Sequence, residues 1–490
     1  MPRRERVERG LPMGYGEQTG GGGKKTLLSD CEVVAEDLEM SLEKLKEFMK
    51  PYLELFPGVK SQRHGEDFME GLLSDLERKS VEPIAERLGQ SRRPLQYFIG
   101  ESPWEHQPFL ARLGEQVAQE IGEPNGILMI DPSTFPKKGK DSVGVARQWC
   151  GRLGKMESCQ KGIFLGYVTN LGHALVDERL YLPREWTTDK ARKEKCGVPK
   201  DVRFKTAQKL ALDMVEERRK EFPHGWIVAD DEFGRPFAFR KGLEEMGERY
   251  LLDIPSNLLV RVIRRKADQK IGAAGRGRKK TPYARVDAWK NGLANADWKK
   301  IHIRDGTKGP LTVWAARVRV QTKDQGLRSK KIQWLLAIKT EGRNPEVRYC
   351  LSNAEEEVRL DEMVHAANAR HWVEDCFERA KGEVGLGHYE VRSWRGWHHH
   401  IALSLMALYF LVTEQRRLNK STPALTLQQS AEAIGEILRH PEIDVKSLAF
   451  TITQRLRRNE QSRIDHWRKF HRLPPPWTLT RSNHVPIFAQ

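Results

Sequence analysis

The chain has 490 residues, with 84 Lys or Arg against 67 Asp or Glu, so its formal net charge is +17. Hydrophobic residues make up 39% of the chain and charged residues 31%. These proportions are typical of a globular protein of two to four domains and exclude a fibrous or wholly disordered chain. The basic surplus favours a polyanionic partner, of which nucleic acid is the commonest.

The pattern of apolar residues predicts neither a secretory signal nor a membrane-spanning segment. Residues 1–25 contain no apolar run of the kind found in secretory signals, and the most apolar stretch, 401–412, is too short to span a bilayer. The six cysteines are scattered and form no C-x-x-C pair, so they indicate neither a zinc site nor a disulfide framework. We therefore expect a cytoplasmic protein with no membrane partner.

The first part of the chain predicts a flexible tail and a helical domain. Residues 1–27 include a glycine run and cannot bury a core, whereas 28–122 carry leucines and phenylalanines at helical spacing. Residues 81–89 and 91–96 resemble two short helices joined by a glycine turn. A DNA-binding helix-turn-helix and an ordinary helical bundle fit this pattern equally well.

The pattern changes to alternating strands and helices over 123–257. We expect strands at 127–130, 163–168, 174–182, 226–229 and 250–254, and helices at 201–220 and 236–246. This order predicts a mixed α/β sheet. Asp131 ends the first strand and Asp230 ends the fourth, and ligand chemistry in such sheets gathers at strand ends.

Residues 258–355 predict a β-rich insertion. The stretch 261–280 carries nine Lys or Arg and is interpreted either as a phosphate-contacting segment or as a solvated loop. Strands are expected at 311–320, 332–339 and 347–351.

The helical pattern returns in the last part of the chain. Residues 356–415 contain one long expected helix, 361–383, and an apolar helix, 401–412. In the C-terminal region, 416–490, we expect helices near 426–439 and 445–470 and an extended polyproline stretch at 473–477.

Asp131, Asp230 and Glu374 form a candidate metal-binding set. Phosphodiester cleavage needs an activated water and a neutralised phosphate, which two divalent ions held by carboxylates can supply. Arg370 and Lys381 lie four residues before and seven after Glu374, on the same face of the expected helix. The alternative for these three residues is a surface salt-bridge ladder.

These residues carry a family resemblance. Arg370, Glu374 and Lys381 match most of the signature Y-x-x-R-x-x-x-E-x-x-x-x-x-x-K, although the tyrosine position holds Ala367. Together with the segments 131–140, 228–234 and 383–400, they resemble the DDE transposases of bacterial insertion sequences. That family has an RNase H-like core interrupted by a β-rich insertion, so the resemblance implies this fold here.

The resemblance also implies an activity. Asp131, Asp230 and Glu374 would bind two Mg²⁺ or Mn²⁺ ions, and Arg370 and Lys381 would hold the DNA phosphate. The enzyme would cut double-stranded DNA at the inverted-repeat ends of its element and join the freed 3′-hydroxyls to target DNA. It would act as a homodimer in a synaptic complex, associated with the nucleoid. The helical domain 28–122 would bind the ends.

Further candidate residues lie around this set. Phosphate contacts are expected from Lys137, Lys138 and Arg392, and base stacking or core packing from Trp394 and Trp397. For His398, His399 and His400 we expect a structural or DNA-facing role, because consecutive helical residues point in different directions.

Two other functions remain open from the sequence. One is a metal-dependent DNA nuclease without strand transfer, which the carboxylates alone do not distinguish from a transposase. The other is a DNA-binding regulator on a transposase-derived scaffold, and the intact carboxylate set argues against it.

Overall fold

The computed structural model describes residues 30–263, 282–306, 309–324, 327–328, 331–342, 344–439 and 444–470. The predicted tail at 1–27, most of the basic stretch 261–280 and the polyproline stretch lie outside these residues. Among the described residues, no helix is both long and apolar enough to cross a membrane.

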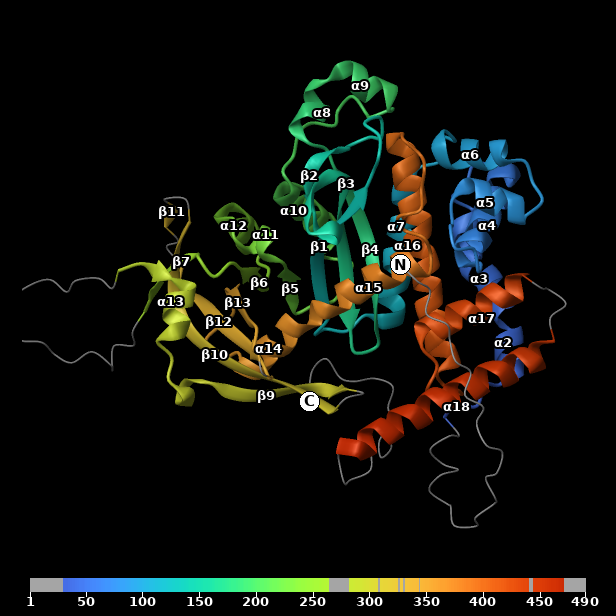
Figure 1. The fold of residues 1–490 in the computed structure, drawn as a ribbon. Coiled ribbons are helices and arrows are strands. Elements are labelled where there is room, and N and C mark those ends of the chain that lie inside the picture. The colour runs from blue at the N-terminus through green and yellow to red at the C-terminus, as the bar shows by residue number, and fades with distance from the viewer. Residues whose placement is uncertain are drawn as a thin grey trace, which may run out of the picture.

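Helices form the N-terminal part of the chain, as the apolar spacing predicts (Figure 1). Their bounds are α2 (Ala35–Glu39), α3 (Ser41–Leu53), α4 (Val59–Leu73), α5 (Val81–Arg87), α6 (Arg92–Gly100) and α7 (His106–Ile121). Each of the longer helices buries one face; α3, for example, buries Leu45, Phe48 and Tyr52. α5 and α6 are joined through Gly89, whose φ of +62° is readily adopted only by glycine.

A mixed sheet forms the centre of the molecule. Its strands are β1 (Ile127–Pro136), β2 (Ala146–Cys150), β3 (Lys155–Thr169), β4 (Gly172–Tyr181), β5 (Trp226–Ala229) and β6 (Tyr250–Ile254). β3 pairs antiparallel with β1, β2 and β4, whereas β1, β5 and β6 run parallel to one another. The prediction of a mixed α/β fold with an RNase H-like core is confirmed.

The first strand is longer than predicted. β1 does not end at Asp131 but continues to Pro136, because residues 132–136 keep pairing with β3. Its pairing with β5, however, stops at Ile130 and Ala229. Asp131 is therefore the first residue at which β1 has lost its parallel neighbour.

Helices cover both faces of this sheet, and alternate residues of β4 show which helix lies where. Arg179 forms an ion pair with Glu217 of α10 (Ala207–Arg218), whereas the adjacent Glu178 contacts His398 of α16 (Trp394–Leu418). Because successive strand residues point to opposite faces, α10 and α16 lie on opposite sides of the sheet. Shorter helices around the core are α8 (Arg184–Thr188), α9 (Lys190–Lys195), α11 (Asp231–Gly234) and α12 (Phe237–Glu245).

The prediction of a single helix over residues 361–383 is wrong. The structure has two helices, α14 (Leu360–Ala369) and α15 (His371–Gly382), separated at Arg370. The amide of Val373 bonds the carbonyl of Arg370, a spacing of three residues rather than four, so the turn is tighter than α-helical. The break places Arg370 at the start of α15.

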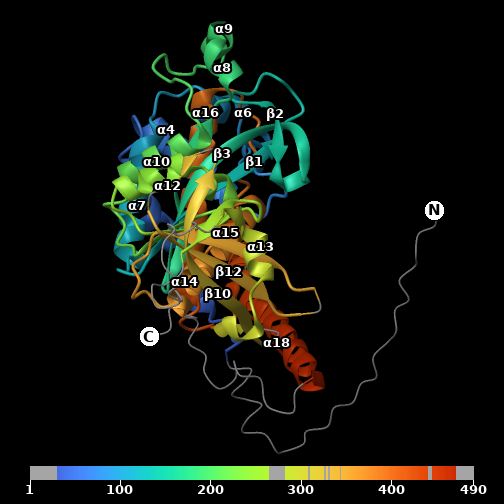
Figure 2. The same ribbon diagram turned by 90° about the vertical axis from the view of Figure 1, so that its left-hand side faces the viewer.

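The insertion extends the core sheet rather than forming a separate one (Figures 1 and 2). Its last strand, β13 (Val347–Ser352), pairs antiparallel with β6. The other elements are β7 (Leu259–Val262), β8 (Ala284–Arg285), α13 (Val286–Asn291), β9 (Lys299–Gly306), β10 (Gly309–Asp324), β11 (Leu327–Arg328) and β12 (Gln333–Thr340). The described part of the insertion is thus β-rich, as predicted, and reaches the core through β6.

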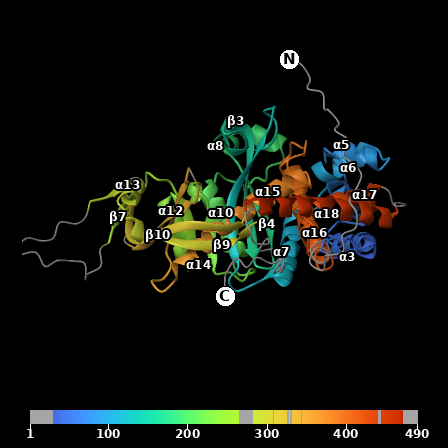
Figure 3. The same ribbon diagram turned by 60° about the horizontal axis from the view of Figure 1, so that its bottom comes forward.

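The C-terminal helices α17 (Leu427–Arg439) and α18 (Val445–Phe470) lie on the side of the molecule that carries the N-terminal helices (Figure 3). A small apolar cluster joins α18 to α2 and to the end of α16, through Leu38, Leu418 and Ile452. The main apolar cluster is continuous from α3 through the central sheet to α16. α16 is therefore the element that connects the helical part to the sheet.

Candidate active site

Asp131 and Asp230 lie side by side at the edge of the central sheet. Each follows the last paired residue of two neighbouring parallel strands, Ile130 of β1 and Ala229 of β5. Neighbouring strands are about 4.8 Å apart, so the two carboxylates are close together. Asp230 also caps α11, since its side chain accepts a hydrogen bond from the amide of Glu232 at 3.1 Å.

Burial and neighbouring negative charges make this pair of carboxylates hard to ionise. Burial raises the pKa of Asp131 to about 8, and the nearby charge of Asp230 adds to the effect. Burial likewise raises the pKa of Asp230 to about 6, against the opposing charge of Arg370. A bound divalent cation would stabilise both groups in their ionised form, and carboxylate oxygens are the ligands that Mg²⁺ prefers. The residues present therefore fit such an ion.

Arg370 lies at the centre of the acidic groups. Its guanidinium forms an ion pair with Asp253, the fourth residue of β6, and lies 3.9 Å from Asp131 Oδ1. Its Nη2 is 3.5 Å from Oε1 of Glu374. One arginine thus connects three carboxylates that come from β1, β6 and α15.

Glu374 is the exposed member of the set. It lies in the first turn of α15, and its side chain is 60% exposed. The next residue, Asp375, points elsewhere, because its carboxylate lies 3.6 Å from His173 and 3.5 Å from Arg379. The structure thus brings Asp131, Asp230 and Arg370 together, with Glu374 beside them.

Sequence reasoning missed Asp253. The strand that carries it was predicted with its correct bounds, but a single carboxylate in an apolar strand belongs to no motif. Besides Arg370, it interacts with Cys350 Sγ, which donates a hydrogen bond at 3.1 Å, and with Arg348 at 3.6 Å. The available signal was its position, since Asp253 lies near the end of the strand that follows β5 in the sheet.

A cavity of about 610 Å³ opens beside the acidic groups. Asp230, Asp253 and Arg370 line it from the core, and Ile338 and Tyr349 line it from the insertion. The insertion therefore forms one wall of the space next to the carboxylates.

The predicted phosphate-binding cations differ in accessibility. Lys138 and Arg392 are exposed. Lys137 is half-buried; it donates a hydrogen bond to the carbonyl of Tyr389 at 3.1 Å, and burial lowers its pKa to about 8. Lys381 is half-buried beside the rings of Phe135 and Phe377. Lys138 and Arg392 are thus directly available to a large ligand, whereas Lys137 is already engaged.

The prediction that Trp397 stacks on a base is wrong. Its side chain is 0% exposed, and its indole N–H donates to the hydroxyl of Tyr389 at 3.1 Å. Trp394 is half-buried and packs edge-on against His398. The alternative of core packing accounts for both residues.

A DNA-facing role for His398, His399 and His400 is also wrong, since all three are buried. His400 bonds the carbonyl of Gly385 and His399 contacts the carbonyls of Ile99 and Trp104. Their predicted structural role agrees with these contacts.

Comparison with known proteins gives three similarities. The DDE superfamily endonuclease family matches residues 53–310. The chain is 23% identical over 352 residues to the probable transposase for insertion sequence element IS701 of Microchaete diplosiphon, covering 70% of this chain and 81% of that protein. The NurA nuclease structure from Sulfolobus solfataricus is 11% identical over 56% of this chain and 81% of that chain, with a TM-score of only 0.23.

The mixed sheet and the carboxylates at its edge define the class as an RNase H-like α/β enzyme. The family match covers more than half of the chain, so the chain belongs to the DDE superfamily endonuclease family. The matched residues include Asp131 and Asp230 and end before Glu374. The resemblance to insertion-sequence transposases indicated by the motifs is thereby confirmed.

Proposed function

We propose that the chain is a DNA transposase that cleaves DNA at the ends of its element and joins those ends to target DNA. The observation that carries this proposal is the adjacency of Asp131 and Asp230 at the ends of paired strands, with Arg370 and Glu374 beside them. The similarity to an insertion-sequence transposase supports it.

In this proposal Asp131, Asp230 and Glu374 hold two Mg²⁺ or Mn²⁺ ions. When bound, such ions supply an activated attacking oxygen and neutralise charge at the phosphate. The two aspartates are partly buried at the ends of paired strands, which fix where their side chains begin. Glu374 is exposed on α15 and completes the site from the solvent side.

Arg370 and Lys381 are proposed to bind the DNA phosphate next to the cleaved bond. Asp253 forms an ion pair with Nη1 of Arg370. The Nε side of the same guanidinium faces Asp131. Lys138 and Arg392 are proposed to contact the DNA backbone further away, because both are exposed. The half-buried Lys137 is proposed to contact the DNA backbone only after its hydrogen bond to the carbonyl of Tyr389 is broken.

DNA ends are proposed to bind along the N-terminal helices, within a homodimer that holds two ends together. α6 begins with the basic pair Arg92 and Arg93, which are exposed. A transposase must pair its ends before joining them, which is the reason for the dimer. The nucleoid is the proposed location, because the net charge of +17 favours binding to chromosomal DNA.

A joining assay tests this proposal. The substrate is a duplex with a pre-cleaved 3′-hydroxyl end, taken from the inverted repeats that flank the gene, incubated with a target plasmid and Mg²⁺. We expect the ends to be joined to the plasmid by the purified chain and not by an Asp230→Asn variant. Cutting of uncleaved ends without joining would instead identify a nuclease. Binding without either reaction would identify a regulator.

A further inference from the structure

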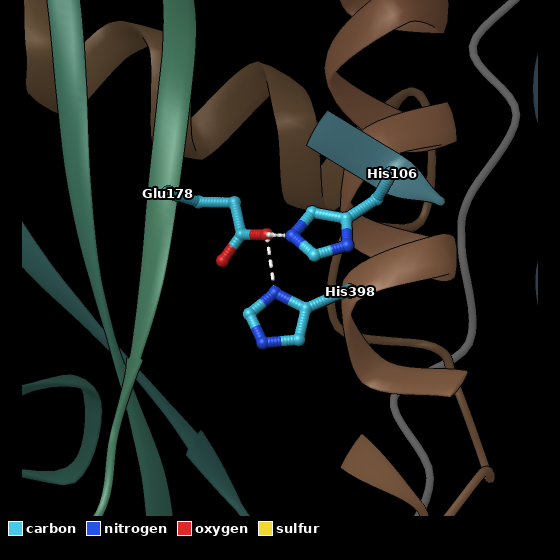
Figure 4. A group of neighbouring side chains, drawn as sticks. All are labelled: His106, Glu178 and His398. Atoms are coloured by element: carbon cyan, nitrogen blue, oxygen red, sulfur yellow. Dashed lines mark hydrogen bonds and ion pairs between the residues drawn. The ribbon is translucent and has the colours of Figure 1, made fainter. Parts of the chain in front are cut away.

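A cluster of two imidazoles and one carboxylate is buried between α7, β4 and α16 (Figure 4). His398 Nδ1 lies 2.6 Å from Glu178 Oε1, and His106 Nε2 lies 3.8 Å from the same oxygen. The two imidazole rings are stacked, with centroids 4.3 Å apart, and both direct a nitrogen at the carboxylate. The three ligand atoms all lie within 4.8 Å of one another.

This cluster is separate from the carboxylates of the candidate active site. In the sheet, Glu178 is paired with Phe164 of β3, and Phe164 is paired with Asp131 of β1. Glu178 and Asp131 are thus two strands apart, or about 10 Å. The ring of Phe164 lies between them and packs edge-on against Phe377 of α15. Ligand binding at this cluster is therefore independent of the proposed transposase activity.

Two polar atoms of the cluster make no hydrogen bond within the described residues. They are Glu178 Oε2 and His398 Nε2, and both are buried. The side chains of Glu178 and His398 are 0% and 2% exposed, and that of His106 is 13% exposed. Leaving polar atoms buried without partners costs free energy, so such atoms call for an explanation. An ion held at the cluster would give Glu178 Oε2 a partner, as the second oxygen of a ligating carboxylate, whereas His398 Nε2 lies on the far side of its ring from Nδ1 and is not explained by the ion.

The donor set indicates which cation fits. Two imidazole nitrogens with one carboxylate oxygen are a typical ligand set for Zn²⁺ and for related transition metals, whereas Mg²⁺ prefers oxygen ligands alone. Three protein ligands leave one position of a tetrahedral ion open to water. The least buried ligand, His106, marks the side from which water could enter.

We propose that His106, Glu178 and His398 bind one zinc-type transition metal ion. The ion joins three parts of the chain: the N-terminal helices through His106, the catalytic sheet through Glu178 and the connecting helix α16 through His398. Bound there, the ion fixes the helical part against the sheet at a point where α16 passes both. The scattered cysteines gave no hint of this site, since none of its ligands is a cysteine.

The test measures zinc on the full chain at saturating Mg²⁺, which occupies oxygen-ligand sites. After removal of metals, Zn²⁺ is added and unbound metal is dialysed away. We expect the wild type to retain one equivalent of zinc and to gain a few degrees in Tm, because an ion that binds only the folded state stabilises it. Co²⁺ in place of zinc should give the visible absorption of nitrogen-ligated cobalt.

Three variants, His106→Gln, Glu178→Gln and His398→Gln, should lose the retained zinc and the zinc-dependent shift in Tm. His399→Gln is the matched control: this histidine is the buried neighbour of His398 on α16, but its nitrogens face backbone carbonyls. It should keep one equivalent of zinc even if its Tm is lower. His106→Gln keeps the test decisive if Glu178→Gln fails to fold, because His106 is the most exposed ligand.

The proposal is overturned if the wild type retains no zinc and shows no zinc-dependent change in Tm. It is also overturned if His106→Gln retains as much zinc as the wild type. Loss of joining activity alone would not bear on it, since the carboxylates of the active site are separate.

Discussion

Asp253 shows how a residue outside the predicted set can shape the site. It holds the guanidinium of Arg370, whose other edge lies against Asp131 and Glu374. Asp253 contacts no reacting group in this arrangement, so we assign it a positioning role. The same contact explains why Arg370 faces the carboxylates rather than solvent.

Replacement of Asp253 by Asn should weaken this positioning. The amide keeps the shape of the side chain but loses the charge that attracts Arg370, so we expect DNA cleavage to fall at least tenfold. Stability should fall by about 1–3 kcal/mol, the usual cost of a hydrogen-bonded partner lost from a buried site. The cleavage rate at saturating DNA and the urea midpoint measure the two effects. Unchanged cleavage by a folded variant would show that Asp253 does not position Arg370 for the reaction.

Trp397 is the residue for which burial decides between two roles. It is fully buried and bonds Tyr389, so Trp397→Ala should lower the free energy of unfolding by about 3–5 kcal/mol. Trp149 offers a control, since it is 60% exposed and its replacement by Ala should change stability by less than about 0.5 kcal/mol. Urea unfolding measures both. Weaker binding of single-stranded DNA by Trp397→Ala, at unchanged stability, would restore the stacking role.

At the scale of elements, the Phe233–Gly234 pair after Asp230 has a packing explanation. A Cβ added to Gly234 would lie 1.9 Å from the carbonyl oxygen of Asp253, so only glycine lets α11 pass this close to β6. Phe233 is fully buried and anchors the same turn. The motif thus fixes the short helix that Asp230 caps.

Gly234→Ala should therefore push α11 away from β6. We expect a loss of at least about 1–3 kcal/mol in stability, the usual cost of overpacking, together with loss of DNA cleavage because Asp230 moves. Gly382→Ala is the matched control: this glycine ends α15 and has open space around its Cα. It should leave stability unchanged or raised. A Gly234→Ala variant as stable and active as the wild type would show that the turn can adapt.

The elements also show which parts of the site could be predicted from the sequence. The strands that carry or directly precede Asp131, Asp230 and Asp253 were predicted because they are short apolar runs, and β6 was placed with its correct bounds. The break at Arg370 was not predicted, because the apolar spacing continues through it. The His106–Glu178–His398 cluster was not predicted either, since its ligands are 72 and 220 residues apart and only the packing of α7, β4 and α16 joins them.

At the scale of the whole molecule, the net charge of +17 should govern DNA affinity. The logarithm of the binding constant should fall linearly with the logarithm of salt concentration, by about 0.9 for each phosphate contacted. Lys138→Ala and Arg392→Ala should each reduce this slope by about 1, because both side chains are exposed and are proposed to contact the DNA backbone. Lys220→Ala, an exposed lysine that follows α10, should leave the slope unchanged. Equal slopes for all three variants would remove Lys138 and Arg392 from the DNA interface.

The central claim is that the carboxylates at the edge of the sheet, with Glu374 beside them, carry out metal-dependent DNA cleavage. The most direct measurement compares Glu374→Gln with Glu378→Gln in the Mg²⁺-dependent cleavage of DNA ends. Both glutamates are exposed on α15, one turn apart, so the two variants differ mainly in their distance from Arg370. We predict that Glu374→Gln lowers the cleavage rate at least a thousandfold while Glu378→Gln cleaves at nearly the wild-type rate. Equal rates for the two variants would contradict the account.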